Sequence, residues 1–329
     1  MIQFNSKVMT FEEFRDEWLS DKSYIDAQTS GSTGSPKRIK LDKEFVAASA
    51  RATNSFFSLG SCSRLHSCVA ADFIGGKMML VRSIISGGIF SWENPSNRPL
   101  EGFSKSDRID LLAVVPSQML HILDHLDRMP SIGAIIIGGS AIHDSLRKRI
   151  VASGLCCYET YGMTETSSHI ALRKIDSEKA GLFEVIGELT LGLDERGCLT
   201  IEYPTGYRVV TNDMAELFGV RNFNILGRAD DIIVTGGKKL NPFDVEAELG
   251  RISEVECYVS SQSDDKWGEM VVVVVESKEN VIKLRESMPY FTLPHWMLPK
   301  KIVKVDAFPR TPNGKIHRMK LRDIIRKIM

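Results

Sequence analysis

The sequence of 329 residues lacks any excess of charge: 42 basic side chains balance 42 acidic ones. A chain without net positive charge has no general attraction for nucleic acid or for an anionic membrane surface. The apolar runs, such as residues 271–275, are too short to cross a bilayer. The first 24 residues carry early acidic side chains and lack the apolar stretch of an export signal. We therefore expect a cytoplasmic protein without nucleic acid or membrane insertion.

Paired cysteine motifs are missing as well. The sequence has no CxxC pair and no histidine cluster beside its six cysteines, which are Cys62, Cys68, Cys156, Cys157, Cys198 and Cys257. Disulfides are rare in a reducing cytoplasm, and zinc sites usually bring their ligands together at short, regular spacings. The cysteines are accordingly expected to be buried free thiols rather than parts of disulfides or of a zinc site.

Two familiar phosphate-binding motifs are also absent. The chain contains neither G-x-x-x-x-G-K-[ST] nor G-x-G-x-x-G, and IIIGGSA (135–141) lacks the glycine spacing of the second motif. The stretch QTSGSTGSPK (28–37) nevertheless has suitable chemistry, since Gly31 and Gly34 let backbone amides turn toward a ligand, hydroxyls add donors and Lys37 adds charge. These residues alone leave two interpretations open, a phosphate loop or an ordinary polar connection.

The middle of the chain alternates between strand and helix patterns. Apolar, β-branched runs that end at glycine or proline predict strands at residues 111–116, 132–139 and 197–204. Predicted helices cover residues 117–129, with Met119, Leu120, Leu123 and Leu126 at helical spacing, and residues 144–154, from an Asp144 N-cap to a Gly154 stop. This alternation is typical of a parallel sheet with helices on its faces. We expect a large N-terminal α/β domain with a parallel-sheet core.

The pattern changes beyond about residue 228. Short helices are predicted at 244–252 and 281–288, and strands at 271–277 and 300–308. These elements indicate a small, separate α+β domain. The predicted domains are therefore residues 1–228 and residues 229–329.

Six ordered segments resemble the signature motifs of the adenylate-forming superfamily, which includes acyl-CoA synthetases, luciferases and peptide-synthetase adenylation domains. They are TSGSTGSPK (29–37), IIIGGSAI (135–142), YGMTETS (161–167), TNDMAEL (211–217), GRADDIIVTGGKKLNPFDVEAEL (227–249) and PRTPNGKIHR (309–318). Asn212 stands where the family has glycine. The segments span nearly the whole chain. The resemblance implies an enzyme that activates a carboxylic acid with ATP as an acyl-adenylate and then passes the acyl group to a thiol.

The resemblance also implies how the phosphates of ATP are held. The loop would hold the β- and γ-phosphates through Thr29, Ser30, Gly31, Ser32, Thr33, Gly34 and Lys37. Glu165 would bind Mg²⁺ bridging the phosphates, and Thr164 would donate to the α-phosphate. A carboxylate suits that hard ion. Outside this motif, the Thr-Glu pair would instead be interpreted as a capping or surface feature.

The nucleoside would be held by residues from three of the motifs. Tyr161 offers a flat face for adenine, and Asp213 and Arg228 are assigned to the ribose. Close backbone approach to the base is expected at Gly138, Gly139, Ser140 and Gly162.

The predicted C-terminal domain carries residues for both half-reactions. Lys315 follows the turn sequence TPNG, and the resemblance implies that it stabilises charge between the carboxylate and the α-phosphate. Asp230 occupies the family's hinge position. Gly236 and Gly237 would line the approach of the thiol. In this two-face model, one face of the domain carries Lys315 and another carries Gly236 and Gly237. Because both faces must reach the same site, the domain is expected to rotate about the hinge.

The position of the predicted phosphate loop narrows the resemblance to one group of enzymes within the superfamily. The loop begins at Thr29, so the N-terminal subdomain typical of the family is almost wholly missing. We expect a naturally compact enzyme rather than a nonfunctional fragment. Short forms of this kind resemble the o-succinylbenzoate-CoA ligases of menaquinone biosynthesis. Residues 72–84 resemble the segment lining their acyl pocket, with Phe73 where many relatives have histidine.

An acid such as o-succinylbenzoate has a second carboxylate that does not react. Lys77 and Arg173 lie close to pocket motifs and are candidate partners for it, and His169 is a weaker one. The alternative for each is surface exposure or an ordinary salt bridge, and it is slightly favoured.

Three functions remain open. The leading one is a CoA ligase for an aromatic carboxylic acid that uses ATP and Mg²⁺ and acts as a monomer or homodimer. A second would load the acyl group onto a carrier protein. The third is a noncatalytic nucleotide-binding module, and the presence of Lys315 and Glu165 argues against it.

The lysine motif generates a test of the two-face model. Lys315→Ala is expected to abolish adenylation, because the charge between the reacting carboxylate and phosphate loses its cation. Thioester formation from supplied acyl-adenylate should continue. The two half-reactions are measured separately, as pyrophosphate release and as acyl-CoA formation. Loss of both in the variant would contradict the model.

Overall fold

The structure is a computed structural model that describes residues 9–29, 37–142, 144–310, 316 and 318–328. The chain forms two compact units, residues 1–189 and residues 190–329. The boundary predicted from sequence, between residues 228 and 229, falls inside the second of these units. It stays a prediction about where a mobile domain begins.

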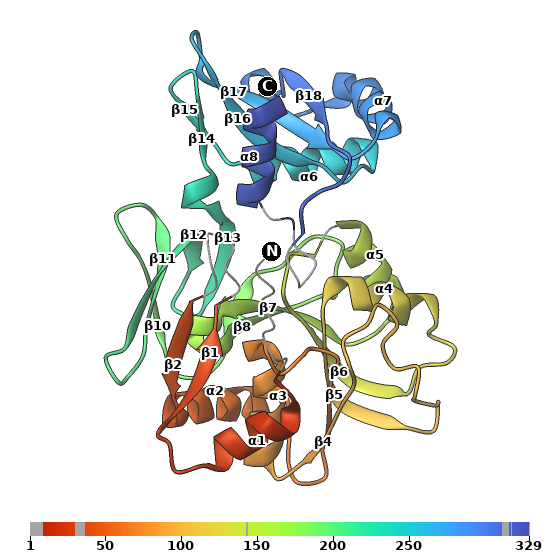
Figure 1. The fold of residues 1–329 in the computed structure, drawn as a ribbon, viewed down its shortest axis with the longest axis vertical. Coiled ribbons are helices and arrows are strands. Elements are labelled where there is room, and N and C mark those ends of the chain that lie inside the picture. Colours follow the sequence, from red (N-terminus) through yellow and green to blue (C-terminus); the bar gives the residue numbers. More distant parts are fainter. Residues whose placement is uncertain (1–8, 30–36, 143, 311–315, 317, 329) are drawn as a thin grey trace, which may run out of the picture. The chain divides into compact units, whose positions relative to one another are not determined.

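The first unit is built on a sheet with the strand order β9-β8-β7-β6-β5-β3-β4 (Figure 1). Its strands are β3 (Arg64–Ser67), β4 (Ile89–Trp92), β5 (Arg108–Val114), β6 (Ser131–Ile137), β7 (Cys157–Met163), β8 (Ser168–Lys174) and β9 (Phe183–Val185). Strands β4, β3, β5, β6 and β7 pair in parallel, whereas β8 and β9 are antiparallel. The predicted parallel-sheet core is confirmed.

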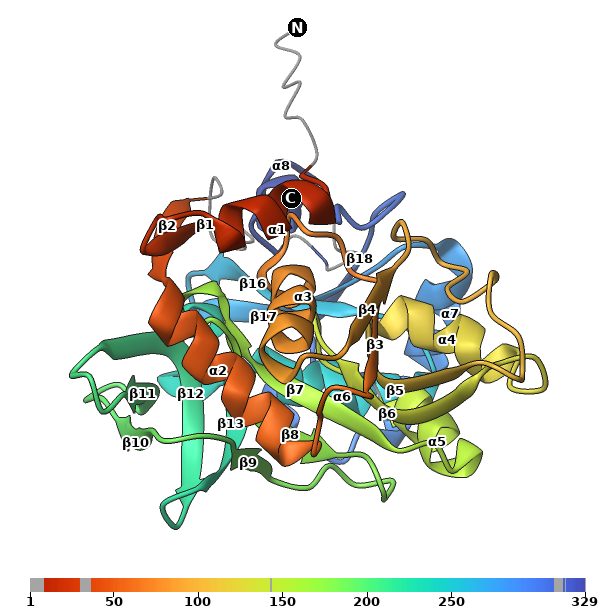
Figure 2. The same ribbon diagram turned by 90° about the horizontal axis from the view of Figure 1, so that it is seen from below.

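Helices cover both faces of this sheet. They are α2 (Lys43–Phe56), α3 (Ile74–Ser86), α4 (Pro116–Asp124) and α5 (Asp144–Ser153). Side chains alternate between faces along a strand, so Ile135 and Ile137 of β6 pack with α4 and α5, while Ala134 and Ile136 pack with Met79 of α3. Figure 2 shows α2 and α3 lying over this second face. Burial on both faces explains the unbroken apolar runs in the sequence.

A separate hairpin carries the predicted phosphate loop. Strands β1 (Tyr24–Gln28) and β2 (Arg38–Asp42) pair antiparallel, with Gln28 opposite Arg38. Helix α1 (Phe11–Leu19) begins with a capping box between Thr10 and Glu13. Phe14 of this helix is fully buried in a cluster with residues of the hairpin, α2 and α3. An isolated two-stranded hairpin is marginally stable, so this cluster is what anchors it.

The helix predicted at residues 117–129 is shorter than expected. Helix α4 ends at Asp124 because His125 leaves the helical conformation, with φ −131° and ψ 30°. Met119 and Ile122 form its buried stripe, whereas Leu120 is exposed. Helix α5 fits its prediction better. Gly154, at φ +70°, follows its last residue, although Asp144 is its first helical residue and not its cap.

The second unit begins with an antiparallel meander and continues into a smaller sheet. The meander is β10 (Thr190–Leu193), β11 (Cys198–Glu202), β12 (Arg208–Phe218) and β13 (Asn222–Arg228). The second sheet contains β14 (Ile233–Thr235), β15 (Lys238–Leu240), β16 (Tyr258–Asp264), β17 (Gly268–Val275) and β18 (Lys301–Lys304). Its helices are α6 (Pro242–Ser253), α7 (Lys278–Ser287) and α8 (Arg318–Ile328).

Strand β17 is the centre of this second sheet. Val271 and Val273 pack on one face with α6 and α7, and Val272 and Val274 pack on the other with α8. The predicted α+β character of this region, with the helices near 244–252 and 281–288, is confirmed.

The structure corrects one expectation about the cysteines. Four cysteines are buried free thiols as predicted, but Cys62 and Cys156 are exposed.

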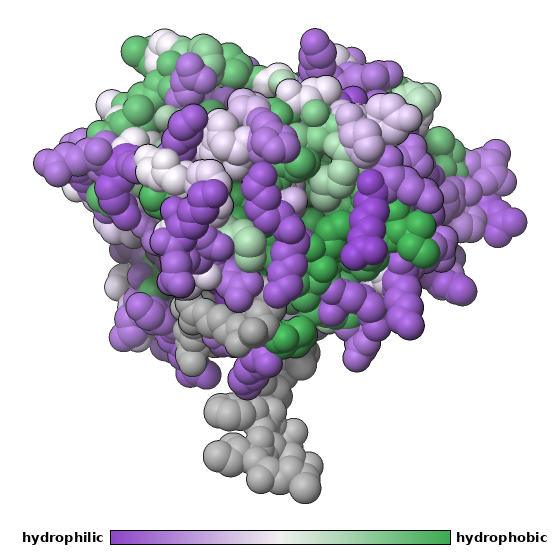
Figure 3. Space-filling view, turned by 90° about the horizontal axis from the view of Figure 1, so that it is seen from above, coloured by the Kyte–Doolittle hydropathy of each residue, from purple (hydrophilic) through white to green (hydrophobic). Residues whose placement is uncertain are grey.

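Hydrophilic side chains cover most of the face drawn in Figure 3, with smaller hydrophobic areas between them. Within the described parts of the chain, no helix combines the length and the apolarity needed to cross a bilayer.

Candidate active site

The base of the predicted phosphate loop is closed by the hairpin. The Thr29 amide donates to the Lys37 carbonyl (2.9 Å), and the Lys37 amide donates to the Thr29 hydroxyl oxygen (3.1 Å). These bonds extend the β1–β2 ladder by one step and fix both ends of the loop. Ser30, Gly31, Ser32, Thr33 and Gly34 lie outside the described residues, so their phosphate-binding role stays a prediction.

The TET segment lies against this loop base. Thr164, in the single 3₁₀ turn η1 (Thr164–Thr166) after β7, donates its hydroxyl to the Gln28 carbonyl (3.3 Å). Thr166 accepts from the Met163 amide (2.9 Å) and donates to the Ser168 carbonyl (2.7 Å). The turn is therefore fixed internally and attached through Thr164 to the end of β1, and its middle residue, Glu165, is half-buried.

Backbone strain marks the same turn. Ser167 and Ser168 have φ values of +53° and +81°, in the left-handed region that non-glycine residues rarely adopt. Ser49 of α2 donates to the Ser167 carbonyl (2.9 Å), which helps to hold this conformation. Strained backbone that the surroundings enforce is typical of functional sites.

Glycine is required where the segments meet. A Cβ atom on Gly162 would lie 2.1 Å from the Ser168 carbonyl oxygen of β8. A Cβ on Gly138 would lie 2.9 Å from the Thr160 hydroxyl, and Gly139 has φ +93°. Only glycine lets the backbones approach this closely. Ser140, next in the chain, is exposed.

These segments converge because of the sheet topology. The Gly138–Ser140 segment follows β6, and Tyr161 and Gly162 lie near the end of β7, which pairs in parallel with β6. Ligands of open α/β sheets bind beyond the carboxyl ends of the strands. The Tyr161 ring packs at a tilt against the Phe183 ring, with centroids 5.7 Å apart. The structure thus brings together the predicted adenine segment and the base of the predicted phosphate loop at one edge.

In the second unit the two predicted ribose ligands are neighbours. Asp213 of β12 lies opposite Arg228 of β13, and their side chains form an ion pair (3.1 Å). Asn212, which departs from the family's glycine, donates to the Asp230 carboxylate (2.8 Å) and accepts from Arg196 (2.9 Å). The substitution therefore ties β12 to the predicted hinge residue.

The predicted hinge borders a buried ionic cluster. Asp230 lies in the 3₁₀ turn η2 (Ala229–Asp231). The next residue, Asp231, is buried and pairs with Arg322 of α8 (2.7 Å), and Arg318 lies 4.0 Å away. Arg318 also pairs with Glu246 (2.7 Å). Helix α8 is thus fastened directly to the turn that follows the meander.

The remaining C-terminal predictions are only partly covered by the structure. Gly236 (φ +55°) and Gly237 (φ +74°) form the tight turn between β14 and β15, and two successive positive φ values explain the glycine pair. Arg310 and Ile316 pair as an antiparallel bridge. Lys315 lies outside the described residues, so its catalytic role stays a prediction.

Two of the proposed acid-binding cations have partners within the protein. Lys77 is buried, lies 4.0 Å from the Glu17 carboxylate and sits over the Phe14 ring (4.1 Å). Its burial lowers its pKa. Arg173 pairs with the buried Glu159 (2.7 Å) and lies over the Phe183 ring. These contacts fit the alternative of ordinary salt bridges, and the substrate-binding roles stay predictions.

A third cation, not singled out from the sequence, has no such partner. Arg82 of α3 is fully buried, and among the described residues its side chain has no carboxylate partner and hydrogen-bonds to the Met79 sulfur (3.6 Å) and to His169 Nδ1 (3.5 Å). Its Nε has no hydrogen-bond partner there. Burial lowers the pKa of Arg82 to about 9. A buried charge without a counterion is costly, so this guanidinium is a candidate to meet an anionic ligand.

His169 connects Arg82 to the TET motif. It lies opposite Gly162 in the β7–β8 ladder, and its Nε2 lies 2.9 Å from the Thr53 hydroxyl. Burial, together with the charge of Arg82, holds the pKa of His169 well below its usual range. The histidine is therefore neutral at physiological pH, and its predicted weak role toward a carboxylate would not be that of a cation.

A family model described as AMP-binding enzyme matches residues 27–192, just over half of the chain. The chain belongs to the AMP-binding enzyme family. The model of the family's C-terminal domain matches residues 244–315, and this second match ends at Lys315. The adenylate-forming identity expected from the ordered motifs is confirmed.

Several relatives match this AMP-binding enzyme over nearly all of its length. The 2-succinylbenzoate–CoA ligases of Listeria monocytogenes and Bacillus cereus are 26% and 25% identical, and the alignments cover 94% and 95% of this chain and 72% and 73% of theirs. An acyl-CoA synthetase (AMP-forming)/AMP-acid ligase II-like protein from Dyadobacter fermentans is 30% identical, with a TM-score of 0.61, over 96% of this chain and 93% of that one.

One solved structure with the same fold contains a reaction intermediate. The o-succinylbenzoate CoA synthetase of Bacillus subtilis, in complex with its acyl-adenylate, has a TM-score of 0.79 at 23% identity. The likeness covers 91% of this chain and 68% of that one. It supports the two-domain α/β fold of the AMP-binding enzymes for this chain.

The neutral His169 predicts an acid-sensitive first unit. The folded protein keeps this histidine unprotonated, whereas the unfolded chain takes up a proton near pH 6.5, so the free energy of unfolding should fall as the pH drops below that value. The slope should reach about 1.4 kcal/mol per pH unit. His169→Gln should remove this contribution, which urea unfolding at several pH values would measure.

The matched control is His125→Gln, which removes another histidine of the same unit. It should keep the acid dependence of the unmodified chain. An equal slope for His169→Gln and the unmodified chain would show that His169 is not the group responsible.

Proposed function

We propose that the chain is an ATP-dependent acid–CoA ligase that forms an acyl-adenylate and then an acyl-CoA thioester, with o-succinylbenzoate as its acid. The observation that carries the ligase assignment is the Thr164–Gln28 hydrogen bond. It places the TET turn against the base of the Ser/Thr/Gly loop at the carboxyl edge of the parallel sheet. The relatives named 2-succinylbenzoate–CoA ligase support the choice of acid.

The described residues suit the first half-reaction. Thr29 and Lys37 flank the loop proposed to hold the β- and γ-phosphates, and Thr164 faces the same loop base. Glu165 is the carboxylate proposed to hold Mg²⁺, which would neutralise phosphate charge when bound. A Bacillus subtilis synthetase has been solved with ATP and a magnesium ion. Asp213 and Arg228 are proposed as ribose ligands.

The second half-reaction requires an acceptor for the acyl group. We assign CoA to this role because the relatives are named CoA ligases, with Gly236 and Gly237 on its approach and Asp230 as the hinge between the two half-reactions. With o-succinylbenzoate as its acid, the enzyme would act in menaquinone biosynthesis, in the cytoplasm. A carrier protein remains the alternative acceptor.

Arg82 is proposed to meet the second carboxylate of the acid. It lies on the helix that follows Phe73, the residue assigned to the acyl pocket, and touches the histidine opposite Gly162. A carboxylate would supply the counterion that the described residues do not provide. Lys77 and Arg173 are weaker candidates because each already lies beside a glutamate.

The proposed reaction is tested by pyrophosphate release from ATP with a panel of carboxylic acids, each with and without CoA. We expect the fastest release with o-succinylbenzoate, and formation of its CoA thioester only when CoA is present. Pyrophosphate release with another aryl acid but not with o-succinylbenzoate would reject o-succinylbenzoate as the substrate. Adenylate formation without CoA thioester would favour a carrier protein, and no release with any acid would favour a noncatalytic module.

Arg82→Met tests the anion partner. The Michaelis constant for o-succinylbenzoate should rise about tenfold or more, because a charge-assisted hydrogen bond is worth roughly 1.5–3 kcal/mol. The constant for ATP should stay unchanged. An analogue that lacks the second carboxylate should be much less affected. Methionine fills a similar volume, and apolar replacement of a buried charge is usually tolerated.

Lys77→Met is the matched control on the same helix. It removes a cation that already has an internal partner, so the Michaelis constant for the acid should stay near that of the unmodified chain. If the Michaelis constant for o-succinylbenzoate rose in Lys77→Met but not in Arg82→Met, Lys77 and not Arg82 would be the partner of the second carboxylate.

A further inference from the structure

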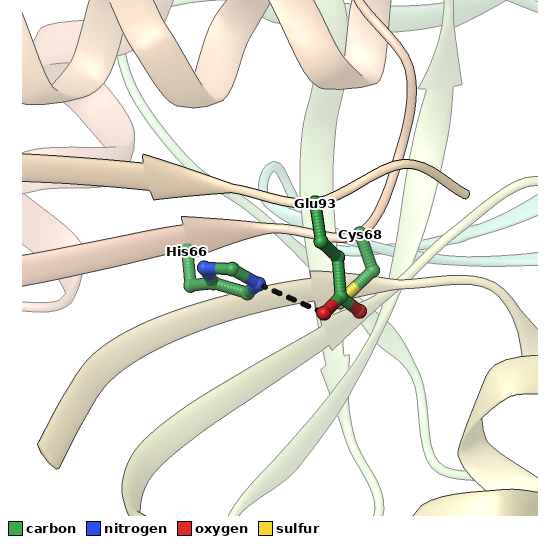
Figure 4. Close-up of side chains that lie close together, drawn as sticks. All are labelled: His66, Cys68 and Glu93. Carbon is green, nitrogen blue, oxygen red and sulfur yellow. Dashed lines mark ion pairs between the residues drawn. The ribbon is translucent and has the colours of Figure 1, made fainter. Parts of the chain in front are cut away.

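Three metal-ligating side chains meet at the carboxyl ends of β3 and β4, apart from the site described above. His66 lies in β3, Cys68 follows that strand, and Glu93 follows β4. Strands β3 and β4 pair in parallel with Ser67 opposite Trp92, so the residues after them lie side by side. One nitrogen, one sulfur and one carboxylate oxygen all lie within 4.8 Å of one another (Figure 4).

The surroundings of this cluster are apolar. His66 is 2% exposed and Cys68 is fully buried, and the Phe103 ring packs edge-on against the imidazole at 4.8 Å. His66 Nε2 is buried and points toward the Glu93 carboxylate, 3.9 Å away, the ion pair drawn as a dashed line in Figure 4, and it makes no hydrogen bond among the described residues. A buried polar atom without a partner calls for an ion or an ordered water.

Neighbouring residues hold the three side chains in place. Ser91 lies 2.8 Å from His66 Nδ1, and a bond at that nitrogen leaves Nε2 for a ligand. The Leu100 amide donates to both Glu93 oxygens (3.0 and 3.1 Å) from a left-handed backbone, φ +66°. The cluster is therefore supported from outside in the way that metal ligands usually are.

We propose that His66, Cys68 and Glu93 bind a divalent transition-metal ion of the zinc class. Imidazole nitrogen, thiolate and carboxylate are all zinc ligands, and a water would complete four-coordination. The thiolate excludes Mg²⁺ and Ca²⁺, which prefer oxygen ligands. Binding replaces the thiol proton of Cys68, which leaves to solvent.

The observed spacing is close to that of a bound site. Bond lengths of about 2.0–2.3 Å place the ligand atoms of a tetrahedral ion roughly 3.4–3.7 Å apart. His66 Nε2 and Glu93 Oε2 are 3.9 Å apart. Small side-chain rotations would therefore close the cluster around an ion.

The sequence contains two of the three ligands as H-x-C (66–68), which is neither a CxxC pair nor a histidine cluster. Residues two apart on a strand point to the same side, and the third ligand comes from the neighbouring strand. The expectation of free thiols rested on the absence of CxxC pairs and histidine clusters, whereas the third ligand here, Glu93, lies far along the chain. An ion here would clamp the ends of β3 and β4 just before the segment that carries Phe73.

The metal-free alternative is a hydrogen-bonded trio. Burial, with the nearby Glu93 charge, raises the pKa of Cys68 well above its usual range, so a neutral thiol could donate to Glu93. This alternative and the metal site differ in one observable, a bond between the thiolate and an ion.

Co²⁺ is the probe, because a thiolate ligand gives it a charge-transfer absorption and tetrahedral geometry gives it intense visible bands. Metal-free full-length protein is titrated with Co²⁺ and then with Zn²⁺. We expect one Co²⁺ per chain with both signals, displaced by Zn²⁺. Cys68→Ser should abolish the charge-transfer band, and Glu93→Gln should weaken affinity by about 10-fold or more.

Controls separate this site from others on the chain. Cys62→Ser removes an exposed cysteine and should leave the spectrum unchanged. His121→Ala removes one ring of the His121–His125 contact at the end of α4, where the ring centroids lie 4.2 Å apart, and should also leave the spectrum unchanged. If Cys68→Ser does not fold, the loss of affinity in Glu93→Gln carries the test. No thiolate–Co²⁺ band in the unmodified chain, or a band that survives Cys68→Ser, would overturn the proposal.

Discussion

The parallel pairing of β4, β3, β5, β6 and β7 is the constraint on which the first unit depends. Parallel strands all end at the same edge, so side chains and turns that follow different strands meet there regardless of their separation in sequence. The Gly138 turn and the TET turn after β7 reach that edge, and so does the His66–Cys68–Glu93 cluster. Antiparallel pairing would have divided these groups between two edges.

Strand β8 runs antiparallel to β7, so the chain reverses direction at this edge, and the turn between the two strands belongs to the candidate site. The reversal requires Gly162, whose missing side chain lets the Ser168 carbonyl approach, and it is held by a turn with two left-handed serines. The same turn reaches the hairpin through Thr164. The hairpin has few ladder bonds of its own, so its two strands are held by the cluster around Phe14 and by this contact. In the second unit, Asp231 links α8 to the turn after the meander in a comparable way.

Much of this organisation could be predicted from the sequence, because the informative signals are local. The apolar runs at 111–116 and 132–139 predicted β5 and β6, and the Gly154 stop predicted the end of α5. The ordered motifs predicted the family. Side-chain surroundings were less accessible, because they depend on which face meets which neighbour. Lys77 of α3 lies beside Glu17 of α1, a contact that its place in the sequence did not indicate, and its role toward the acid stays a prediction. Arg82 was overlooked because an arginine inside an apolar helix gives no sign of whether a carboxylate meets it.

Arg82 is fully buried and has no carboxylate partner among the described residues, which bears on how stability and activity are balanced in this chain. A fully buried cation without a counterion raises the free energy of the folded state, and an apolar residue of similar size would avoid that cost. A fold that keeps such a residue is less stable than its packing would allow. Binding of the proposed carboxylate to Arg82 would return that difference to the enzyme. Substrate would act as part of its core, which is the trade-off expected where a binding site is built inside the hydrophobic interior.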